Sequence, residues 1–448
     1  MNQPDFLLSK LGIESLTPMQ QEAMQIASSG NDMVLLSPTG SGKTLAFLLP
    51  LWSWLQQCNT SEERSPVRCL ILSPSRELAL QTASVWRSIG NEYPAVCCYG
   101  GHLMAEERHI LDTRHPSVVI GTPGRVFDLI DKGYLDTSHI TLLIIDEFDK
   151  SLELGFCEVM EDITNSLSGL RRKWLISATD SEEIPHFLSL GNGQEGELLR
   201  IDYREKDLPE RLTVWHVTSP GRDKLGTLYA LLSTLDNTPI MIFVNHREAV
   251  DRISQYLKKQ KVVCDAFHGG MDQNLRERAL YRFRSGSSHL LIATDLAARG
   301  LDIPEVGAVI HYHLPLQLDA FTHRNGRTAR WTSDGTAFWI SSPDEKLPDY
   351  LAEREDPEYT LPDVLHSPAL PPCVAIYIGR GKKDKISRGD IVGFLCKKGG
   401  LKSDEIGLIE LRDHHCYVAI PRNRVRHTLQ QLRGEKIKGQ RTLIEEAK

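Results

Sequence analysis

The chain has 448 residues, of which 41% are hydrophobic and 25% are charged, and its net charge is −7. This is an ordinary globular composition, the length predicts roughly two to four domains, and the acidic balance weakly disfavours a general nucleic-acid binder. The longest apolar run, residues 45–55, is too short to cross a bilayer, and residues 1–10 lack the pattern of a signal peptide. Nine cysteines without a CxxC spacing favour reduced thiols over zinc or disulfide sites. We therefore expect a cytoplasmic protein without a membrane partner.

Residues 12–20, with the sequence GIESLTPMQ, end in a glutamine shortly before a glycine-rich loop. The amide of Gln20 can donate to and accept from one edge of an adenine, which would select ATP over GTP. An exposed glutamine without such a role is the alternative.

The glycine-rich loop is residues 37–44, SPTGSGKT, between a strand-like run at 32–36 and the apolar residues 45–55, which predict a buried helix. A strand, a glycine loop and a helix opened by Lys-Thr bind phosphates, because backbone N–H groups and the helix N-terminus attract anions. Lys43 would contact the outer phosphates and Thr44 would hold Mg²⁺. A glycine-rich turn before an ordinary helix is the alternative, since serine replaces the first glycine of the strict pattern. The expected nucleotide contacts are Thr39, Gly40, Ser41, Gly42, Lys43 and Thr44.

Beyond this loop, apolar strands alternate with helices, which indicates a parallel sheet covered on both faces. The predicted strands are residues 68–73, 96–99, 117–120, 141–145 and 173–176. The polar motifs that follow them are PSRELA at 74–79, Gly100-Gly101, TPGR at 122–125, DEFD at 146–149 and Ser177-Ala178-Thr179. Ligands bind at the carboxyl ends of such strands, so we expect these motifs to line one edge of the sheet.

Asp146 and Glu147 directly follow the strand TLLII and form the second half of a nucleotide-hydrolysing site. Asp146 would hold Mg²⁺ through water, and Glu147 would orient and deprotonate the attacking water. A helix N-cap aspartate is the alternative interpretation.

A second series of strands follows the charged residues 204–211, which are typical of a linker. Its strands are predicted at residues 212–218, 239–245, 262–268, 289–295, 306–312 and 335–341, without a phosphate loop. It carries ATDLAARGLD at 293–302 and HRNGRTAR at 323–330. Arg324, Arg327 and Arg330 are spaced three apart and would lie along one face of a helix. They are either solvated arginines or arginine fingers that act on a nucleotide held by the first domain.

These motifs, in this order, resemble those of the DEAD-box RNA helicases over residues 12–342. The resemblance implies two RecA-like domains, residues 1–203 and 212–342, that close together on ATP and single-stranded RNA. It implies RNA-dependent ATP hydrolysis that separates short duplexes locally. Two positions depart from the family pattern: Phe148 replaces the alanine of DEAD, and Asn325 replaces an apolar residue of the arginine motif. We expect both departures to make the coupling between the two domains less efficient.

The resemblance also assigns roles to particular residues. Gln20 would contact adenine, Asp302 the ribose, and Arg327 and Arg330 the γ-phosphate. The residues expected to couple the ATP site to RNA are Ser177, Thr179 and His323. The expected RNA contacts are Arg76, Gly101, Thr122 and Arg125 on the first domain and Arg247, Gly269 and Thr294 on the second. The catalytic set is thus Lys43, Asp146, Glu147, Arg327 and Arg330.

Residues 343–372 are proline-rich and predict a linker, and residues 373–448 predict a small βαββαβ domain of the RRM-like type. From residue 371 onward there are 17 Lys and Arg against 9 Asp and Glu, which leaves −15 for the rest of the chain. This basic tail indicates polyanion recognition, or simply solvated lysines. Strand alternation places Tyr377 and Tyr417 on the open face of the sheet, where they would stack on bases or merely border the sheet. The basic loop residues are Arg380, Lys382, Lys383 and Lys385.

The stretch at residues 378–393, IGRGKKDKISRGDIVG, is similar to the C-terminal domain of DbpA-type helicases, which directs that group to a hairpin of the large-subunit ribosomal RNA. We therefore expect a monomeric RNA helicase, with ATP and Mg²⁺ as cofactors and with 23S-type RNA of pre-ribosomal particles as partner. An RNA-binding clamp with weak ATPase activity and a DNA helicase are the alternatives.

Overall fold

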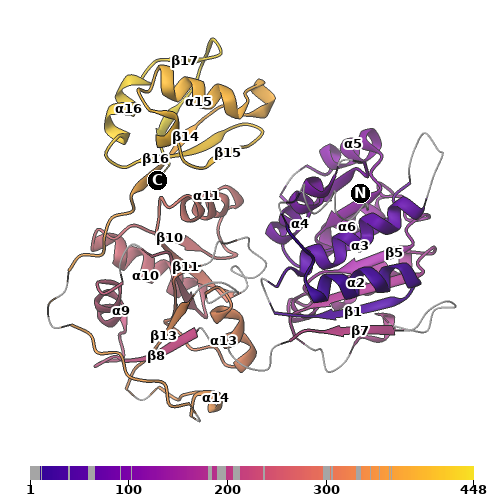
Figure 1. The fold of residues 1–448 in the computed structure, drawn as a ribbon, viewed down its shortest axis with the longest axis horizontal. Coiled ribbons are helices and arrows are strands. Elements are labelled where there is room, and N and C mark those ends of the chain that lie inside the picture. The colour runs from indigo at the N-terminus through magenta and orange to yellow at the C-terminus, as the bar shows by residue number, and fades with distance from the viewer. Residues whose placement is uncertain are drawn as a thin grey trace. The chain divides into compact units, whose positions relative to one another are not determined.

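A computed structural model describes most of the chain and divides it into two compact units. It describes residues 11, 13–38, 41–58, 66–90, 92–101, 103–179, 184–188, 198–204, 212–235, 238–295, 303, 306–328, 334–343, 345–352, 354–362, 364 and 366–447. The first unit holds one parallel sheet, and the second unit holds another parallel sheet together with a C-terminal antiparallel sheet (Figure 1). No helix in the described ranges is long and apolar enough to cross a membrane.

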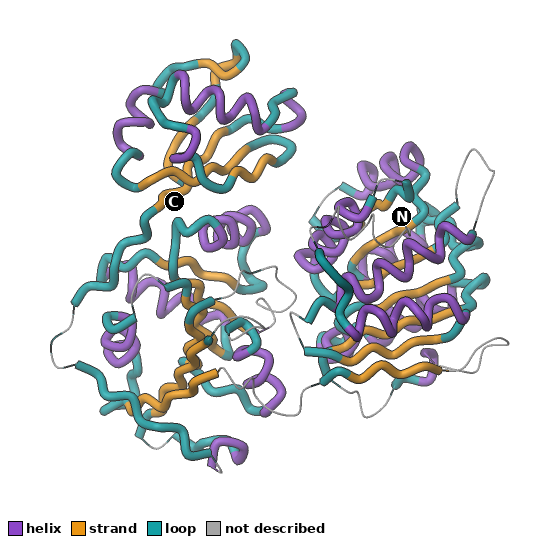
Figure 2. The backbone as a smooth tube through the Cα atoms, viewed as in Figure 1, coloured by secondary structure: helices purple, strands orange, loops and turns teal. Residues whose placement is uncertain are grey.

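The first unit is a parallel sheet with the strand order β3-β4-β2-β5-β6-β1-β7, and helices connect its strands along the chain and pack on its faces (Figure 2). Its strands are β1 (Asp32–Leu36), β2 (Cys69–Leu72), β3 (Ala95–Cys98), β4 (Val118–Gly121), β5 (Leu142–Ile145), β6 (Arg172–Ser177) and β7 (Leu198–Asp202). Its helices are α2 (Pro18–Ser29), α3 (Lys43–Gln57), α4 (Arg76–Ile89), α5 (Met104–Arg114), α6 (Pro123–Asp131), α7 (Phe148–Glu153) and α8 (Cys157–Ser166), with a 3₁₀ turn at His186–Leu188.

Both faces of this sheet are buried, which explains its continuously apolar strands. Met33 and Leu35 of β1 pack into one core with residues of α2, α3 and α4. Val34 and Leu36, which point to the opposite face, pack into a second core with residues of α6 and α8. The predicted RecA-like architecture of this part is confirmed. The sequence analysis missed β7, an edge strand on which alternate side chains remain exposed.

The second unit begins with a parallel sheet of order β10-β11-β9-β12-β13-β8. Its strands are β8 (Leu212–Thr218), β9 (Ile240–Val244), β10 (Cys264–Phe267), β11 (Leu290–Thr294), β12 (Ala308–His311) and β13 (Gly335–Ser341). Its helices are α9 (Leu225–Leu232), α10 (Arg247–Lys259), α11 (Gln273–Arg284) and α13 (Leu318–Asn325). Residues of α9 and α10 share one core with alternate residues of β9, such as Ile242 and Val244.

Residues 343–372, predicted as a proline-rich linker, include a short helix, α14 (Asp349–Ala352), and a stretch that lies against this sheet. The backbone N–H of Tyr359 donates to the carbonyl of His216 on β8 at 2.7 Å, and the N–H of His216 donates to the carbonyl of Pro357 at 2.9 Å. Because β8 is the edge strand, this stretch covers backbone groups that would otherwise be unpaired.

The C-terminal antiparallel sheet has the order β15-β16-β14-β19, the strand order of an RRM-like sandwich. Its elements are β14 (Cys373–Ile378), α15 (Arg388–Lys397), β15 (Ile409–Leu411), β16 (Cys416–Pro421), α16 (Val425–Gln431) and β19 (Ile444–Glu446), with 3₁₀ turns at Lys382–Asp384 and Ser403–Glu405. As predicted, Val374, Ile376 and Ile378 are paired with Ile420, Val418 and Cys416 and form the core. The strand predicted at residues 440–445 is divided: β18 (Gln440–Arg441) forms a hairpin with β17 (Lys436–Ile437), and β19 follows separately.

Candidate nucleotide and RNA site

The phosphate loop ends in a left-handed Gly42, with φ of 90°, directly before α3 begins at Lys43. A Cβ at this position would lie 2.8 Å from Nε2 of Gln20, so both the dihedral angle and the space require glycine. The Nζ of Lys43 donates to the carbonyls of Ser37 and Pro38, the latter at 3.0 Å. Ser37, the departure from the strict pattern, donates through its hydroxyl to Ser41 at 2.7 Å. The predicted contacts Thr39 and Gly40 lie outside the described residues.

Gln20 is buried and joins α2 to this loop. Its Oε1 accepts from the N–H of Thr17 at 3.0 Å, and its Nε2 donates to the carbonyl of Gly42 at 3.3 Å. The side-chain hydroxyl of Thr17 in turn accepts from the N–H of Gln20, and this capping box fixes the start of α2. The side chain therefore lies beside the phosphate loop, and its contact with adenine remains a prediction.

Asp146 lies at the carboxyl end of β5, and its carboxylate is fully buried. Its Oδ1 accepts from the N–H of Glu147 at 3.0 Å, whereas Oδ2 has no hydrogen-bond partner among the described residues. Burial, and next the charge of Glu147, raise the pKa of Asp146 to about 7, although Lys43 opposes this shift. An orphaned, buried carboxylate oxygen beside a second carboxylate fits a hard cation such as Mg²⁺.

Glu147 occupies the left-handed region, with φ of 47° and ψ of 54°, and precedes α7. A non-glycine residue in this region typically costs about 1–3 kcal/mol and is often retained at functional sites. Glu147, not Asp146, is the N-cap of α7, and its side chain makes no capping bond. The N-cap interpretation of Asp146 is therefore wrong, because the helix begins one residue later than it requires.

Of the residues predicted to couple ATP to RNA, Thr179 contacts the DEFD motif directly and Ser177 contacts Thr179. The hydroxyl of Thr179 donates to Oδ2 of Asp149 at 2.7 Å, and the hydroxyl of Ser177 donates to the carbonyl of Thr179 at 2.5 Å. A change at Asp149 would thus be transmitted to the end of β6. Phe148, suspected of disturbing this region, is only 2% exposed and is part of the core that also contains Ile145 and Leu188.

The predicted RNA contacts of the first unit gather at the ends of the neighbouring strands β3, β4 and β2. Nη1 of Arg76 would lie 2.8 Å from a Cβ added to Gly101, so the guanidinium rests on the glycine pair. Arg125 forms a 2.7 Å ion pair with the buried Glu107, which also accepts from the N–H of Tyr99. Thr122 is the N-cap of α6. Arg125 thus reaches RNA only if it shares or leaves Glu107.

The arginine motif of the second unit differs from its prediction. Helix α13 ends at Asn325, so Arg324, Arg327 and Arg330 do not lie on one helix. The C-cap residue Gly326 ends the helix between the first two of them. Arg327 is buried, and its carbonyl accepts from the N–H of Val306 at 3.0 Å. Asp302 and Arg330 lie outside the described residues, and His323 is half-buried on α13.

Arg324 is a structural residue and not an arginine finger, because its guanidinium is buried in bonds within its own unit. Its Nε and Nη2 form ion pairs with both oxygens of Asp295, at 2.6 and 2.7 Å. Its Nη2 also donates to Oδ1 of Asn245 at 2.9 Å, and its Nη1 to the carbonyl of His313 at 2.6 Å. One side chain thus joins the ends of β9, β11 and β12. Asn245 and Asp295 were missed as site residues, although each is the last residue of a predicted strand and directly follows the observed strand β9 or β11.

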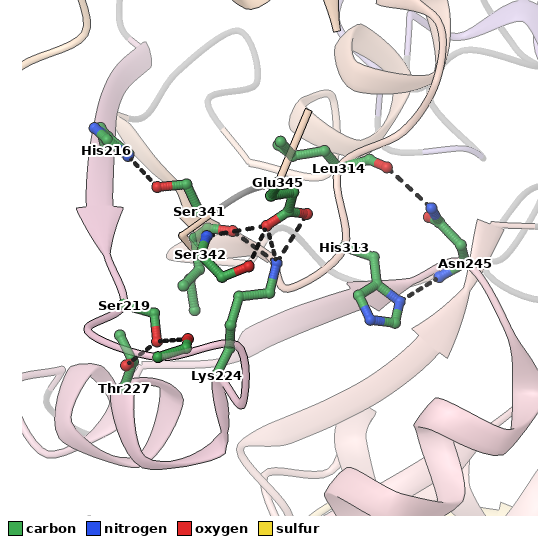
Figure 3. Close-up of polar contacts among 12 residues, drawn as sticks. His216, Ser219, Lys224, Thr227, Asn245, His313, Leu314, Ser341, Ser342 and Glu345 are labelled. Atoms are coloured by element: carbon green, nitrogen blue, oxygen red, sulfur yellow. Dashed lines mark hydrogen bonds and ion pairs between the residues drawn. The ribbon is translucent and has the colours of Figure 1, made fainter. Parts of the chain in front are cut away.

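A polar network extends from these strand ends (Figure 3). Two hydrogen bonds hold Asn245 in position. Its backbone N–H donates to Nδ1 of His313 at 3.3 Å, and its side-chain Nδ2 donates to the carbonyl of Leu314 at 3.0 Å. Burial, and next the charge of Lys224, lower the pKa of His313 to about 4, so the ring is neutral and accepts at pH 7. Lys224 donates to both oxygens of Glu345, at 3.1 and 2.9 Å, in the same view. The network fixes the loop after β12.

Asn325, the second departure from the family pattern, has a partner in the same unit. Its Oδ1 lies 2.8 Å from Nε2 of His311, and both side chains are fully buried. His311 stacks on Phe321 of α13 with ring centroids 4.4 Å apart. The pair therefore joins the end of α13 to β12.

The remaining RNA contacts predicted on the second unit lie at the ends of three neighbouring strands, β9, β10 and β11. Arg247 begins α10 and is exposed, with its Nε 2.9 Å from Glu248. Gly269 follows β10 closely, and Thr294 is the last residue of β11. They share one edge of the sheet, and their contact with RNA stays a prediction.

The C-terminal domain places only part of its predicted RNA site on the surface. Lys382, Lys383 and Lys385 are exposed, whereas Arg380 pairs with Asp384 at 2.8 Å and donates to the carbonyl of Arg441. Tyr377 and Tyr417 lie on the sheet face opposite the core, as predicted. That face is not open, however, since Tyr417 is only 6% exposed.

Comparisons with known proteins identify relatives of this chain. Three family models match: DEAD/DEAH box helicase at residues 17–187, helicase conserved C-terminal domain at 223–332, and DbpA RNA binding domain at 375–446. The chain is 32% identical to the ATP-dependent RNA helicase DbpA of Bacillus subtilis, over 98% of this chain and 96% of that protein. It is 31% identical to DbpA of Escherichia coli, over 96% of this chain and 94% of that protein.

A solved structure of Mss116p bound to single-stranded RNA and AMP-PNP is similar at 27% identity, with a TM-score of 0.67, over 75% of this chain and 72% of that one. The parallel sheets, the phosphate loop and the similarity across nearly the whole chain lead to one conclusion: the chain belongs to the DEAD-box ATP-dependent RNA helicases of the DbpA type, which are RNA-dependent ATPases.

Proposed function

We propose that this helicase remodels structured large-subunit ribosomal RNA, of the 23S type, within assembling pre-ribosomal particles in the cytoplasm, and that it works as a monomer. The observation that carries this proposal is the basic loop of the C-terminal domain, in the region that matches the DbpA RNA binding domain. Both bacterial relatives named DbpA are similar to this chain across nearly their whole length.

The basic loop is held in a fixed shape. The N–H groups of Lys382 and Lys383 donate to the carbonyls of Arg412 and Asp413, at 2.8 and 2.9 Å. Nζ of Lys438 donates to the carbonyl of Lys385 at 2.8 Å. The loop therefore presents three exposed ammonium groups on a turn that is already formed, which suits contacts with RNA phosphates.

For the ATP site we propose the following roles. Lys43 would exchange its loop carbonyls for the outer phosphates. Thr44 and the buried Asp146 would hold Mg²⁺, which neutralises phosphate charge when bound. Glu147 would orient and deprotonate the attacking water, and Arg327 and Arg330 would stabilise the γ-phosphate. The hydrogen bond from Thr179 to Asp149 would transmit structural changes in the ATP site to the edge of the sheet that binds RNA.

Steady-state ATPase measurements test this function, with no RNA, poly(A), single-stranded DNA and a large-subunit rRNA hairpin fragment as separate conditions. We expect the hairpin fragment to give the lowest half-saturating concentration, and DNA to give little stimulation. Equal half-saturation by poly(A) and the hairpin fragment would contradict the rRNA target, and equal stimulation by DNA would favour the DNA helicase. The alternative of a clamp with weak ATPase activity rests on Phe148, which packs into the core of its own domain, and weak stimulation by every RNA would favour it.

A further inference from the structure

Helix α5 buries a carboxylate at the edge of the first sheet. Of its eleven residues only Glu107 and Leu111 are buried, and their spacing of four places them on one stripe of the helix. Leu111 packs into the core on one face of the sheet, whereas Glu107 is only 4% exposed although it carries a carboxylate. Because a buried carboxylate without partners is costly, the contacts of Glu107 must account for its burial.

The two oxygens of Glu107 bind two different motifs of the predicted RNA site. Oε2 accepts from Nη1 of Arg125 at 2.7 Å, and Oε1 accepts from the backbone N–H of Tyr99 at 3.1 Å. Arg125 is the last residue of the TPGR motif, and Tyr99 directly precedes the pair Gly100-Gly101. One side chain from α5 therefore joins two motifs that lie on neighbouring strand ends.

The bond to Tyr99 fixes the end of β3, which is an edge strand with β4 as its neighbour. The ladder with β4 ends at Cys98, and the bond from Tyr99 to Glu107 comes directly after it. The glycine pair that follows supports Arg76, whose Nη1 would lie 2.8 Å from a Cβ at Gly101. A displacement of Tyr99 would therefore move the surface on which Arg76, another predicted RNA contact, lies.

We propose that Glu107 is a positioning residue for RNA, which holds Arg125 and the turn after β3 so that both motifs meet the RNA backbone in the correct geometry. A guanidinium has five N–H donors, so Arg125 can donate to Glu107 and to a phosphate at the same time. This role rests on the RNA contact predicted for Arg125 and does not depend on the rRNA target.

A purely electrostatic effect of Glu107 predicts the opposite sign. A negative charge beside RNA phosphates weakens binding, so its removal alone would strengthen binding. Glu106, the preceding residue on α5, is exposed and carries the same charge, which makes Glu106→Ala a matched control. Only the positioning role predicts that the removal of an acidic side chain weakens RNA binding, and only at Glu107.

The test measures the equilibrium affinity of full-length variants for poly(A) in the presence of AMP-PNP. Glu107→Ala should lower this affinity by about tenfold, which is typical for the loss of one hydrogen bond to a charged group. The slope of log affinity against log salt should become shallower by about 0.7, the share of one phosphate contact on a single strand. Glu106→Ala should bind poly(A) as tightly as the unchanged protein or slightly more tightly.

Two further variants separate positioning from damage to the fold. Glu107→Gln creates no cavity and keeps an acceptor oxygen, so it should restore part of the affinity that Glu107→Ala loses. In the Arg125→Ala background, Glu107→Ala should cost less than in the unchanged protein, because the two side chains act through one contact. Affinity for AMP-PNP without RNA is measured for every variant, since the phosphate loop belongs to the same unit.

Tighter binding of poly(A) by Glu107→Ala, or equal effects of Glu106→Ala and Glu107→Ala, would overturn the proposal. Losses of equal size for AMP-PNP and for poly(A) in both Glu107 variants would assign the residue a structural role and overturn it as well. An unchanged affinity in Arg125→Ala would remove the RNA contact on which the proposal rests. Equal half-saturation by poly(A) and the hairpin fragment would contradict the rRNA target alone, because this test uses poly(A).

Discussion

Replacing Phe148 with alanine distinguishes a core residue from a residue that props the DEFD motif out of position. The ring is 2% exposed and packs with the core that lines one face of the first sheet. Truncating a buried phenylalanine typically costs about 3–5 kcal/mol, because it leaves a cavity. At about 2–4 °C per kcal/mol for a domain of this size, the first unit should melt about 6–20 °C lower, and RNA-stimulated kcat should not rise.

The assay must report on the first unit alone, because the chain has two compact units and need not unfold in one step. Hydrogen exchange at increasing urea concentrations meets this need. Peptides from β5 report on the first unit, and peptides from β9 in the second unit serve as the internal reference. Phe148→Leu, which conserves most of the volume, should cost less than about 1.5 kcal/mol. An unchanged urea midpoint for β5 in Phe148→Ala, together with a higher kcat, would refute this reasoning.

Three further predictions follow from the site. Lys43→Ala should weaken ATP binding, whereas Glu147→Gln should trap the ATP–RNA complex; near-normal turnover of Glu147→Gln would remove its role as base. In the folded protein without nucleotide, the pKa of Asp146 is raised to about 7. Between about pH 4 and pH 7 the folded state therefore holds a proton that the unfolded state has released, and the free energy of unfolding falls as the pH rises through this range. Because Mg²⁺ needs the carboxylate, magnesium titrations should show affinity falling as pH drops below about 7; a pH-independent affinity between 5.5 and 8 would count against Asp146 as a ligand. Neutralising the exposed lysines of residues 382–385 should raise the half-saturating hairpin concentration and flatten its salt dependence, and the same change at Lys397, Lys398 and Lys402 should not.

The edge that carries the motifs could be predicted because it depends on strand order and apolar runs alone. In contrast, the sequence could not predict which element packs on an otherwise exposed face of a sheet. Alternation correctly placed Tyr417 opposite the core, yet nothing near it in the sequence indicates that Tyr281, more than a hundred residues earlier, covers it. Edge strand β7 was missed for a related reason, since its partly exposed residues lack the apolar run of a central strand.

The arginine motif shows a different limit, because spacing predicts a shared face only while the helix continues. The helix ends before Gly326, so Arg324 turns inward to Asp295 and Asn245 while Arg327 follows the end of the helix. Arg324→Ala would leave the carboxylate of Asp295, which is 24% exposed, without its ion pair, so the loss should lie below the roughly 3–5 kcal/mol typical of a fully buried pair. The residue therefore acts on the nucleotide only indirectly, by holding three strand ends in position.

Asn325 departs from the family pattern by placing a fully buried amide where the pattern has an apolar side chain, so its stability cost depends on whether the amide finds hydrogen-bond partners. An unpaired buried amide typically costs about 1–3 kcal/mol. His311 supplies a partner for Oδ1 alone, because Nδ2 of Asn325 and Nδ1 of His311 are buried without a hydrogen-bond partner among the described residues, so part of this cost remains. Burial and the charge of Arg324 lower the pKa of the His311 ring to about 3, which keeps the imidazole neutral. The bond crosses from β12 to Asn325, the last residue of α13, and Arg327 follows directly after the C-cap Gly326. The departure thus replaces apolar packing with a directional bond at the same point, so the position of the arginine motif is kept by a residue outside the motif itself.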